Sequence, residues 1–427
     1  MVSDPQAGLS RRGVLAGAAG VAGILGATQW WLTEHPGPIS LLSQTIAWQR
    51  PGHRVFVQDP RDVVPSSRVL TDATSREELL AGEQEWRAAA PAWLRQGPFS
   101  VLADSAMLDL RVLSLGLPAT AAGWSKRWRY VWPRDASTAA AALAVIGQPA
   151  GALANLSYLQ QVQRADGWFQ ARYDPLTGKS PDDRTRQLDG VGWALWATDQ
   201  VRRVLTSGAD QAVASLADLV RRSTALILEV TDNGRQLPPA GPDYWEISER
   251  IVTLGTVAML AAGLEAATHL LPILDDDPAP ATAALRELDA LREQHFAAFP
   301  RHADGDDPDV SIVFTMPPFR QEPAPGALEA LVCLKPRITR SAGGLAPGSG
   351  WRDDGISWTP ETALVASAFA GTGAGDNATY LLHWLENHRT AAGSLPEKVL
   401  ASGAPAAVAP LSWTASLVLL TIPRLTP

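Results

Sequence analysis

Apolar residues recur every three to four positions along most of the chain, which is the spacing of one buried face of an α-helix. The predicted helices cover 78–93, 101–115, 135–147, 151–164, 187–206, 210–230, 248–270, 279–298, 324–335, 357–372, 375–388 and 409–422. Convincing strands are scarce, and strands do not alternate with helices as a Rossmann or TIM-barrel fold requires. The chain is therefore predicted to be all-α and built from helical hairpins.

Residues that can carry chemistry gather at every second predicted helix start. Trp, Arg, Asp and Glu precede the helices that begin near 135, 187, 248, 357 and 409, whereas the intervening helices begin without them. This alternation implies a further short inner helix within 307–319. Twelve helices in pairs, with an extra leading helix at 78–93, predict an (α/α)6 toroid. Its inner helices would direct their N-termini at one site.

The first residues, 1–33, have the composition of an export segment. Arg11 and Arg12 precede an uncharged stretch, 13–32, that is rich in Gly and Ala. The Ser-Arg-Arg-x-x-Leu arrangement resembles a twin-arginine signal, which carries folded proteins across a bacterial membrane. The sequence leaves open a cleaved signal, a membrane anchor with an interfacial tryptophan pair at Trp30, and a buried N-terminal helix. We expect an exported protein that is secreted or anchored.

Residues 34–77 are polar and rich in proline, and the stretch HRVFVQD within them is compatible with one short strand. We interpret them as an extended lead-in on the surface of the domain. The (α/α)6 domain is predicted to occupy 78–427.

Composition narrows the possible functions. Lys and Arg number 36 against 44 Asp and Glu, a net charge of −8, and no basic stripe indicates nucleic-acid binding. Cys333 is the single cysteine, so no intrachain disulfide can form. Zinc-type spacing, a P-loop and a dinucleotide fingerprint are all missing, so no metal or cofactor is predicted. The 16 tryptophans are unusual, and several fall in Gly- and Pro-rich loops.

The stretch GPDYWEIS, 241–248, has two interpretations. Asp243 and Glu246 could form the capping box of the helix predicted to follow. Alternatively, Glu246 is a catalytic carboxyl beside Trp245, whose ring would desolvate it and raise its pKa. A helix N-terminus favours the anion and would act in the opposite direction. We expect a helix start here and expect desolvation to prevail.

Glu397, in the stretch GSLPEKVLASG, lies in a loop between Pro396 and Lys398 and outside every helical pattern. Capping and helix-dipole explanations therefore do not apply to it. A carboxylate held beside proline is a candidate general base, and the alternative is a solvated ion paired with Lys398. Hydrolysis of a glycosidic bond needs two such carboxyls, one to protonate the leaving oxygen and one to activate water or attack.

The other helix starts that carry Trp, Arg, Asp or Glu offer side chains that bind sugars. Arg and carboxylate side chains hydrogen bond hydroxyls, and indole rings stack on the apolar face of a sugar. At each start the alternative explanation is a capped helix with an ion pair and core aromatics. Glu361 follows Pro360 at one start, and we interpret it as serving the helix dipole. The candidate binding residues are Trp132, Arg134, Asp135, Gln187, Asp189, Trp351, Trp358 and Trp413.

Five short motifs, YVWPRD, QLDG, DYWE, LPEKV and PLSW, occur in this order, and the chain that carries them resembles glycoside hydrolase family 15. These are the glucoamylases and their bacterial relatives, and the resemblance covers about 100–422. It implies an (α/α)6 barrel that releases glucose from non-reducing ends with inversion. It also implies Glu246 as the general acid and Glu397 as the general base.

The same resemblance implies the binding roles. Arg134 and Asp135 would hold the terminal glucose, and Asp243 would support the acid. The tryptophans expected to line this first subsite are Trp132, Trp245 and Trp413.

The chain departs from the family at several positions. Ile247 follows the acid where the best-known fungal members have a second Glu. The loop KSPDDRTR lacks the aromatic that those members carry shortly before the QLDG equivalent. Arg340 and Arg352 both compete for the role of a later sugar-binding arginine. Residues 34–77 are also too few for the β-sandwich domain that often precedes the barrel in bacterial relatives.

The sequence thus predicts an exo-acting, inverting α-glucoside hydrolase for α-glucans or α-gluco-oligosaccharides, with the linkage and the oligomeric state left open. One alternative is a non-catalytic glycan-binding (α/α)6 protein, which needs neither carboxyl. The other is an (α/α)6 enzyme of different chemistry, such as a polysaccharide lyase, for which Tyr130, Tyr173 and Tyr244 are candidate bases.

Overall fold

The computed structural model describes residues 45–57 and 59–425. The predicted export segment, 1–33, lies outside the described residues, so it stays a prediction. A small antiparallel hairpin of β1 (Ile46–Arg50) and β2 (His53–Phe56) comes first, and β2 occupies the stretch where a short strand was predicted. A 3-10 turn, η1 (Pro60–Asp62), and the helices α2 (Arg76–Ala89) and α3 (Ala92–Gln96) follow it.

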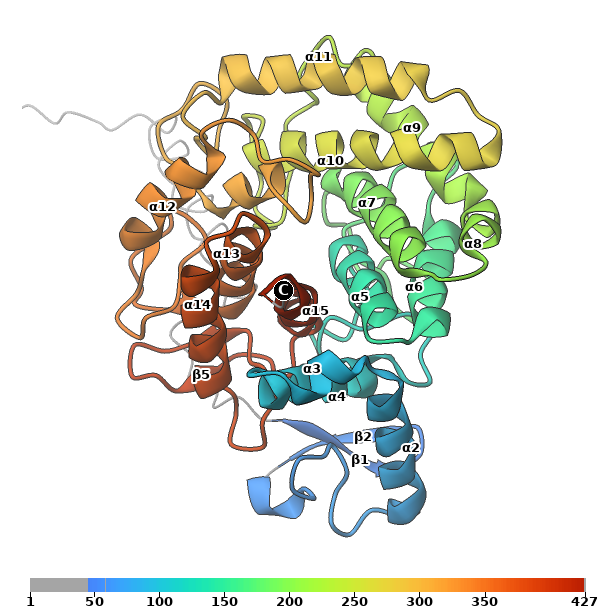
Figure 1. Cartoon of the computed structure of the whole chain (residues 1–427), viewed down its shortest axis with the longest axis vertical. Helices are drawn as coiled ribbons and strands as arrows, with labels where there is room; N and C mark the ends of the chain where they lie inside the picture. Colours follow the sequence, from blue (N-terminus) through green and yellow to red (C-terminus); the bar gives the residue numbers. More distant parts are fainter. Residues whose placement is uncertain (1–44, 58, 426–427) are drawn as a thin grey trace, which may run out of the picture. The chain divides into compact units, whose positions relative to one another are not determined.

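Six inner elements form a closed ring, which confirms the predicted (α/α)6 toroid (Figure 1). They are α5 (Pro133–Val145), α7 (Asp189–Val204), α10 (Leu254–Leu270), η3 (Val310–Thr315), α13 (Thr359–Gly371) and α15 (Ser412–Thr421). Each packs against the next, and α15 packs against α5. The inner element η3 is a 3-10 helix within 307–319, where the alternation required an inner element.

An outer layer of helices covers the ring. Its members are α4 (Ser100–Ser114), α6 (Pro149–Val162), α9 (Ala217–Val230), α11 (Ala279–His295), α12 (Ala327–Ile338) and α14 (Gly375–Asn387). Five of them pack on the inner element that precedes them in the chain, and α4 packs on α15. The sixth pair therefore joins the first helix of the ring to the last. Two short elements, α8 (Ala209–Ser215) and η2 (Leu271–Leu274), complete the helical part before η4 (Ile422–Leu425).

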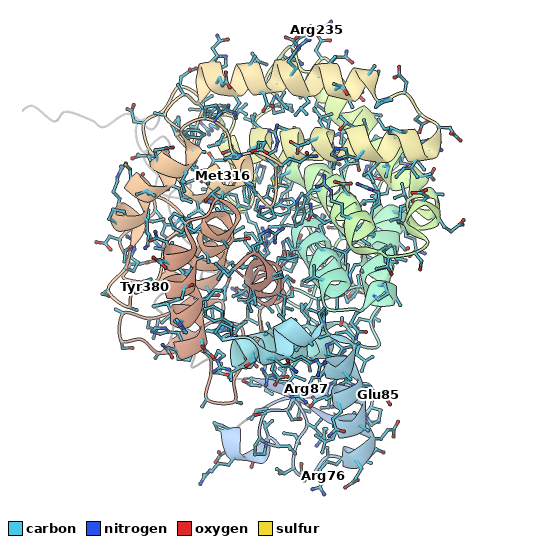
Figure 2. The ribbon with its side chains drawn as sticks, viewed as in Figure 1. Arg76, Glu85, Arg87, Arg235, Met316 and Tyr380 are labelled. Atoms are coloured by element: carbon cyan, nitrogen blue, oxygen red, sulfur yellow. The ribbon has the colours of Figure 1, made fainter. Side chains whose placement is uncertain are left out.

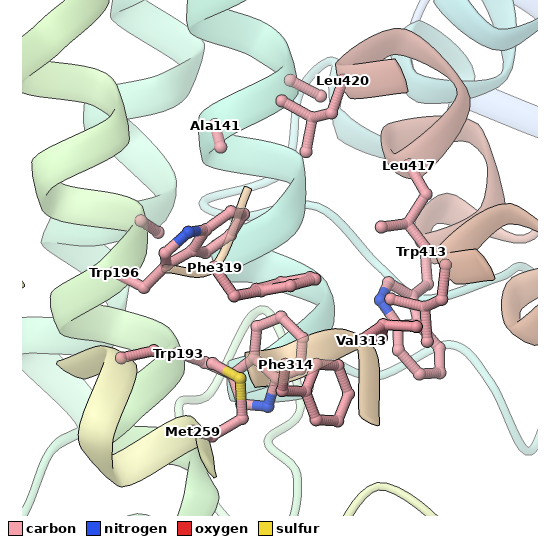
Figure 3. Packing of buried hydrophobic residues seen from close by; sticks show 14 of the residues in the cluster. Ala141, Trp193, Trp196, Met259, Val313, Phe314, Phe319, Trp413, Leu417 and Leu420 are labelled. Carbon is pink, nitrogen blue, oxygen red and sulfur yellow. The ribbon is translucent and has the colours of Figure 1, made fainter. Parts of the chain in front are cut away.

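Small and apolar residues allow the inner helices to approach closely. Gly192 of α7 faces α10 so closely that an added Cβ would lie 2.1 Å from the Met259 carbonyl oxygen. Figure 3 shows the core within the ring, where Trp193 packs edge to face on Phe314 and Phe319, with ring centres 5.3 and 5.4 Å apart.

The α10–η2 stretch is long and apolar enough to cross a membrane, but 72% of its most apolar 18-residue segment is buried inside the protein. Its burial is that of a core helix.

One predicted helix boundary is wrong by several residues. The helix expected from 248 begins at Leu254, with Thr253 as the N-cap, whose hydroxyl accepts from the Thr256 N–H. Residues 241–248 therefore form a loop rather than a helix start, and the capping box of Asp243 and Glu246 does not exist. The apolar pair Ile251 and Val252 extends the helical pattern of α10 backwards without belonging to the helix.

The segment whose Arg68 carbonyl accepts from Trp48 of β1 is tied to α4 by a buried ion pair. Arg68 Nη2 lies 2.7 Å from Asp109 Oδ1 on α4, and Asp109 Oδ2 accepts from the backbone N–H of Leu395 at 2.8 Å. Arg87 of α2 (labelled in Figure 2) also donates to Asp104 of α4 at 3.0 Å. The segment just before Glu397 is thus fastened to α4 and to the hairpin region.

A three-stranded sheet shapes the loop that carries Glu397. Its strands are β3 (Ser357–Trp358), β4 (Lys398–Val399) and β5 (Pro405–Ala406), in the order β3-β4-β5 and all antiparallel. Glu397 directly precedes β4, and β3 runs directly into α13. The sheet therefore holds Glu397 beside the N-terminus of an inner helix.

Candidate active site

Arg134 is the hub of the candidate site. It lies in the first turn of α5, where its Nη1 donates to the Tyr244 carbonyl at 3.2 Å and its Nη2 to Glu246 Oε1 at 3.3 Å. The same nitrogen is 2.9 Å from Asp135 Oδ2, and the guanidinium lies 4.1 Å from the ring centre of Trp413. One buried arginine therefore joins α5, α15 and the loop ahead of α10, as the alternating helix starts led us to expect.

The loop that presents Glu246 is strained and firmly held. Glu246 has a φ of +59°, a left-handed conformation that costs a non-glycine residue about 1–3 kcal/mol. Asp243 is fully buried; its Oδ1 accepts from the Trp245 N–H at 3.0 Å and its carbonyl from the Glu246 N–H at 2.8 Å. Gln187 Nε2 donates to that same carbonyl at 3.2 Å. Together these bonds fix the direction of the Glu246 side chain.

Arg301, which sequence reasoning missed, supports this loop from behind. It is buried, and its Nη2 donates to Asp243 Oδ1 at 2.8 Å and to Glu249 Oε1 at 2.9 Å. Its Nη1 donates to Asp309 Oδ2 at 2.7 Å, and its guanidinium lies 3.7 Å from the ring centre of Trp245. The only local signal was an isolated Arg after proline, between two predicted helices.

The environment of Glu246 differs from the apolar one expected. Its side chain is 25% exposed, and Oε2 accepts from Arg184 Nη1 at 3.1 Å while Oε1 accepts from Arg134. The Trp245 ring instead faces Arg301. The expectation that Trp245 desolvates Glu246 is therefore wrong in its geometry.

Arg184 comes from the loop that lacks the aromatic of the fungal relatives. The loop is braced by ion pairs, since Asp182 Oδ2 lies 3.4 Å from Arg184 Nε and also pairs with Arg172. The Arg172 guanidinium in turn lies 5.2 Å from the ring centre of Trp132. A chain of charges thus runs from the candidate acid to Trp132, and the Asp-Asp-Arg run was its only trace in the sequence.

Glu397 occupies a different environment. It is buried, its N–H donates to the Val408 carbonyl at 2.8 Å, and its own carbonyl accepts from the Thr359 N–H at 3.0 Å. Burial raises the pKa of Glu397, and the charge of Glu246 adds to this, whereas Lys398, a hydrogen bond from Trp128 and Arg134 act in the opposite direction.

Lys398 Nζ lies 3.8 Å from Glu397 Oε2, yet both side chains are largely buried. Glu397 is therefore not the solvated loop ion of the alternative explanation. Its electrostatic coupling to Glu246 and Arg134 means that the two candidate catalytic carboxyls, far apart in the chain, share one site.

Tryptophans line the site as a connected series. Trp245 packs edge to face on Trp351 with ring centres 4.8 Å apart, and Trp351 packs in the same way on Trp358 at 5.4 Å. Lys398 Nζ lies 4.0 Å from the Trp358 ring centre. The wall therefore leads from beside the candidate acid to beside the candidate base.

Several of the buried polar atoms that have no hydrogen-bond partner belong to residues of the candidate site. Within the described part of the chain they include the indole nitrogens of Trp132, Trp245, Trp351, Trp358 and Trp413 and the carboxyl atoms Asp243 Oδ2, Glu361 Oε2 and Glu397 Oε2. Buried polar groups are rarely left unpaired in folded proteins, because each costs about 1–3 kcal/mol. Such a concentration is what a site for a hydroxyl-rich ligand requires.

Some predicted site residues are buried behind this wall. Asp189 Oδ2 accepts from Trp193 Nε1 at 3.2 Å within α7, and burial raises its pKa to about 7. Burial likewise raises the pKa of Asp135 to about 6, against the charge of Arg134. Gln187 contacts backbone rather than an opening. These three residues have the geometry of supports for Arg134 and the Asp243 loop.

Two of the three tyrosines considered as lyase bases form hydrogen bonds, and the third, Tyr130, contacts an arginine. Tyr244 donates to Asp309 Oδ2 at 2.9 Å, and burial raises its pKa well above the ordinary value. The Tyr173 hydroxyl accepts from the Gln170 N–H at 2.7 Å. Tyr130 is half-buried with the Arg172 guanidinium 4.6 Å from its ring centre.

The two arginines that compete for the later sugar-binding role contact their own segment. Arg340 Nη2 donates to the Arg352 carbonyl at 3.2 Å, and Arg352 Nε donates to Asp354 at 2.8 Å. Arg352 also lies 5.7 Å from the Trp351 ring centre, which brings it to the edge of the aromatic wall.

No protein-family model matches the chain, and no curated protein matches it. Several solved structures do match the chain. A wild-type glycosidase matches with a TM-score of 0.66 and 17% identity over 77% of this chain and 97% of that one. A bacterial glucoamylase complexed with acarbose has a TM-score of 0.64 and 16% identity over 82% of this chain, which spans 59% of it.

The glucoamylase of Saccharomycopsis fibuligera matches with a TM-score of 0.62 and 13% identity, over 79% of this chain and 98% of that one. At these identities the likeness concerns the fold. The chain thus has the six-hairpin fold found in glycosidases and glucoamylases.

Proposed function

We propose that this protein is an exo-acting, inverting α-glucoside hydrolase that belongs with the glucoamylases. Glu246 serves as general acid and Glu397 as general base. The observation that carries the proposal is that Glu246 contacts Arg134 at one end of the ring and that Glu397 lies near enough for its charge to interact with both. The fold shared with glycosidases supports it, as do the tryptophan wall and the unpaired polar atoms around it.

In this proposal each of the two carboxyls has one task. Glu246 protonates the glycosidic oxygen as the bond from C1 to that oxygen breaks. Glu397 removes a proton from the water whose oxygen forms the new bond to C1 on the opposite face, which inverts the anomeric centre. A carboxylate whose pKa is raised by burial is a stronger base than an ordinary glutamate.

Arg184 imposes a condition on this mechanism. A proton on Glu246 Oε2 would compete with the Arg184 N–H that this oxygen accepts at 3.1 Å. Proton donation from Oε2 therefore requires Arg184 to withdraw, and an arriving sugar would displace it. Arg134 keeps its other partners, Asp135 and the Tyr244 carbonyl, while a terminal glucose binds beside it.

A non-catalytic glycan-binding protein is the second candidate, because a carboxylate bound by two guanidinium groups also suits a site that only binds. Under either candidate function, the proposed ligand is a neutral sugar that stacks on indole rings.

Export through the twin-arginine-like segment is part of our proposal. It is tested by fractionating cells that express the full chain.

Product analysis tests the function directly. The purified chain is incubated with maltose, isomaltose, trehalose and a dextrin, and the products are followed by proton NMR. We expect glucose as the released sugar and its β-anomer as the first product. An α-anomer formed first would overturn inversion, and no release from any of the four sugars, with binding retained, would favour the glycan-binding candidate.

A further inference from the structure

A further glutamate lies in the site and is used by none of the steps above. Glu361 stands in the first turn of α13, three residues after Trp358 of the aromatic wall. Its side chain is buried, with 4% of the residue exposed, and its Oε2 has no hydrogen-bond partner within the described chain. The dipole interpretation accounts for an acid at this position but not for its burial or its unpaired oxygen.

The backbone around Glu361 is fastened to the Glu397 loop. Thr359, two residues earlier, donates its N–H to the Glu397 carbonyl at 3.0 Å and its hydroxyl to the Pro396 carbonyl at 2.5 Å. The same hydroxyl lies 2.8 Å from that of Thr414 on α15. Glu361 and Glu397 are therefore held beside each other by three segments, and neither can move far alone.

The charged and titratable groups around Glu361 are those of the candidate site. Arg134 from α5 and Lys398 from β4 favour its anion, whereas Glu397 disfavours it, and Tyr244 is the remaining titratable neighbour. Burial outweighs the cations and the helix N-terminus and raises the pKa of Glu361 to about 8. At neutral pH the side chain is therefore a neutral acid with a hydroxyl to donate.

We propose that Glu361 contacts the bound sugar as a neutral acid, donating a hydrogen bond from Oε2 to a sugar hydroxyl beside Glu397. A neutral carboxyl can sit next to the anionic base without adding a second negative charge, and an unpaired buried oxygen gains the partner that it lacks. This role rests on the proposed function for the identity of the sugar. It makes Glu361 a residue that determines specificity, because a sugar without that hydroxyl leaves the acid unpaired.

Two substitutions separate this role from a structural one. Glu361→Leu removes the donor, and we expect the KM for maltose to rise roughly tenfold because a buried hydrogen bond is lost. Glu361→Gln keeps the shape and an N–H donor, so its KM at pH 6 should remain close to that of the unaltered chain. Asp376→Asn is the matched control, since Asp376 is an exposed acid in the first turn of the outer helix α14.

The pH dependence of binding gives a second, independent readout. Calorimetry with maltose, carried out with Glu246→Gln also present so that the sugar is not hydrolysed, should show affinity falling as pH rises through about 8 when Glu361 is present, as Glu361 loses its proton. The Glu361→Gln chain should show no such fall. This comparison holds even if Glu361→Leu does not fold.

The outcomes are distinct. An unchanged KM in a folded Glu361→Leu chain, or the same alkaline fall in the Glu361→Gln chain, would overturn the role of Glu361. Maltose binding without turnover in the unaltered chain would remove the proposed catalysis but leave this test in force. Failure to bind maltose at all would overturn both.

Discussion

Glu246 and Glu397 face the same site from environments of opposite character. The loop around Glu246 is polar and partly open, and two arginines bind its two carboxylate oxygens. The loop around Glu397 is buried, and its nearest cation stands 3.8 Å from an oxygen that has no hydrogen-bond partner. Glu246 is therefore balanced by two positive charges, whereas Glu397 is shielded from solvent. Two residues of one type can thus be prepared for different proton transfers by their surroundings.

Removing either carboxyl should have the largest effect, and the choice of substrate should tell the two apart. We expect Glu246→Gln and Glu397→Gln to lower kcat for maltose by about 10²–10⁴-fold each. With α-glucosyl fluoride, whose leaving group needs little protonation, Glu246→Gln should regain most of its rate and Glu397→Gln should not. Glu287→Gln, on the exposed side of α11, is the control. Equal rescue of both variants would contradict the assigned roles.

The support behind the Glu246 loop should matter mainly for stability. Arg301→Gln leaves Asp243 and Asp309 as buried charges without their partner, and we expect a loss of about 3–5 kcal/mol in the free energy of unfolding. Arg235→Gln removes an exposed partner of Asp232 (Arg235 is labelled in Figure 2) and should leave the free energy of unfolding almost unchanged. Urea titration measures both. Similar losses would show that the Arg301 network is not what holds the loop.

Changing the cation beside Glu397 should shift the pH profile. Lys398 lowers the pKa of Glu397, so Lys398→Met should raise it further. A base must be deprotonated to act, so the acid limb of the kcat/KM profile should move to higher pH. Thr359 and Val408 still hold the backbone, which separates this effect from a displaced loop. An acid limb that stays in place would mean that Glu397 is not the group titrating there.

The smallest effect is expected at Arg184. Arg184→Gln removes one of the two cations on Glu246 while Arg134 remains. We expect a change of a few-fold, with kcat altered more than KM if Arg184 must withdraw before proton donation. Single-turnover rates measure the step directly. A tenfold rise in KM with kcat unchanged would instead make Arg184 a contact for the second sugar.

The local pattern of the chain predicted the ring well but not the contacts across it. Trp, Arg, Asp and Glu at every second helix start predicted six inner elements, and Glu397 was noticed because it lies outside every helical pattern. The same local logic misplaced the start of α10, because Ile251 and Val252 continue its apolar rhythm while Thr253 caps it. Arg184 and Arg301 escaped notice because their partners lie in other segments, and periodicity carries no information about such pairs.

The pairing of α4 with α15 has a consequence for how activity arises during synthesis. The ring cannot close until the last helix has emerged, because α15 packs against both α4 and α5. Until then Arg134 has no Trp413 beside it, and the segment with Glu397 lacks the support of α15. A growing chain therefore carries Glu246, the proposed acid, long before it carries Glu397, the proposed base. Hydrolysis should begin abruptly when α15 has been added, rather than increase as each helix is added.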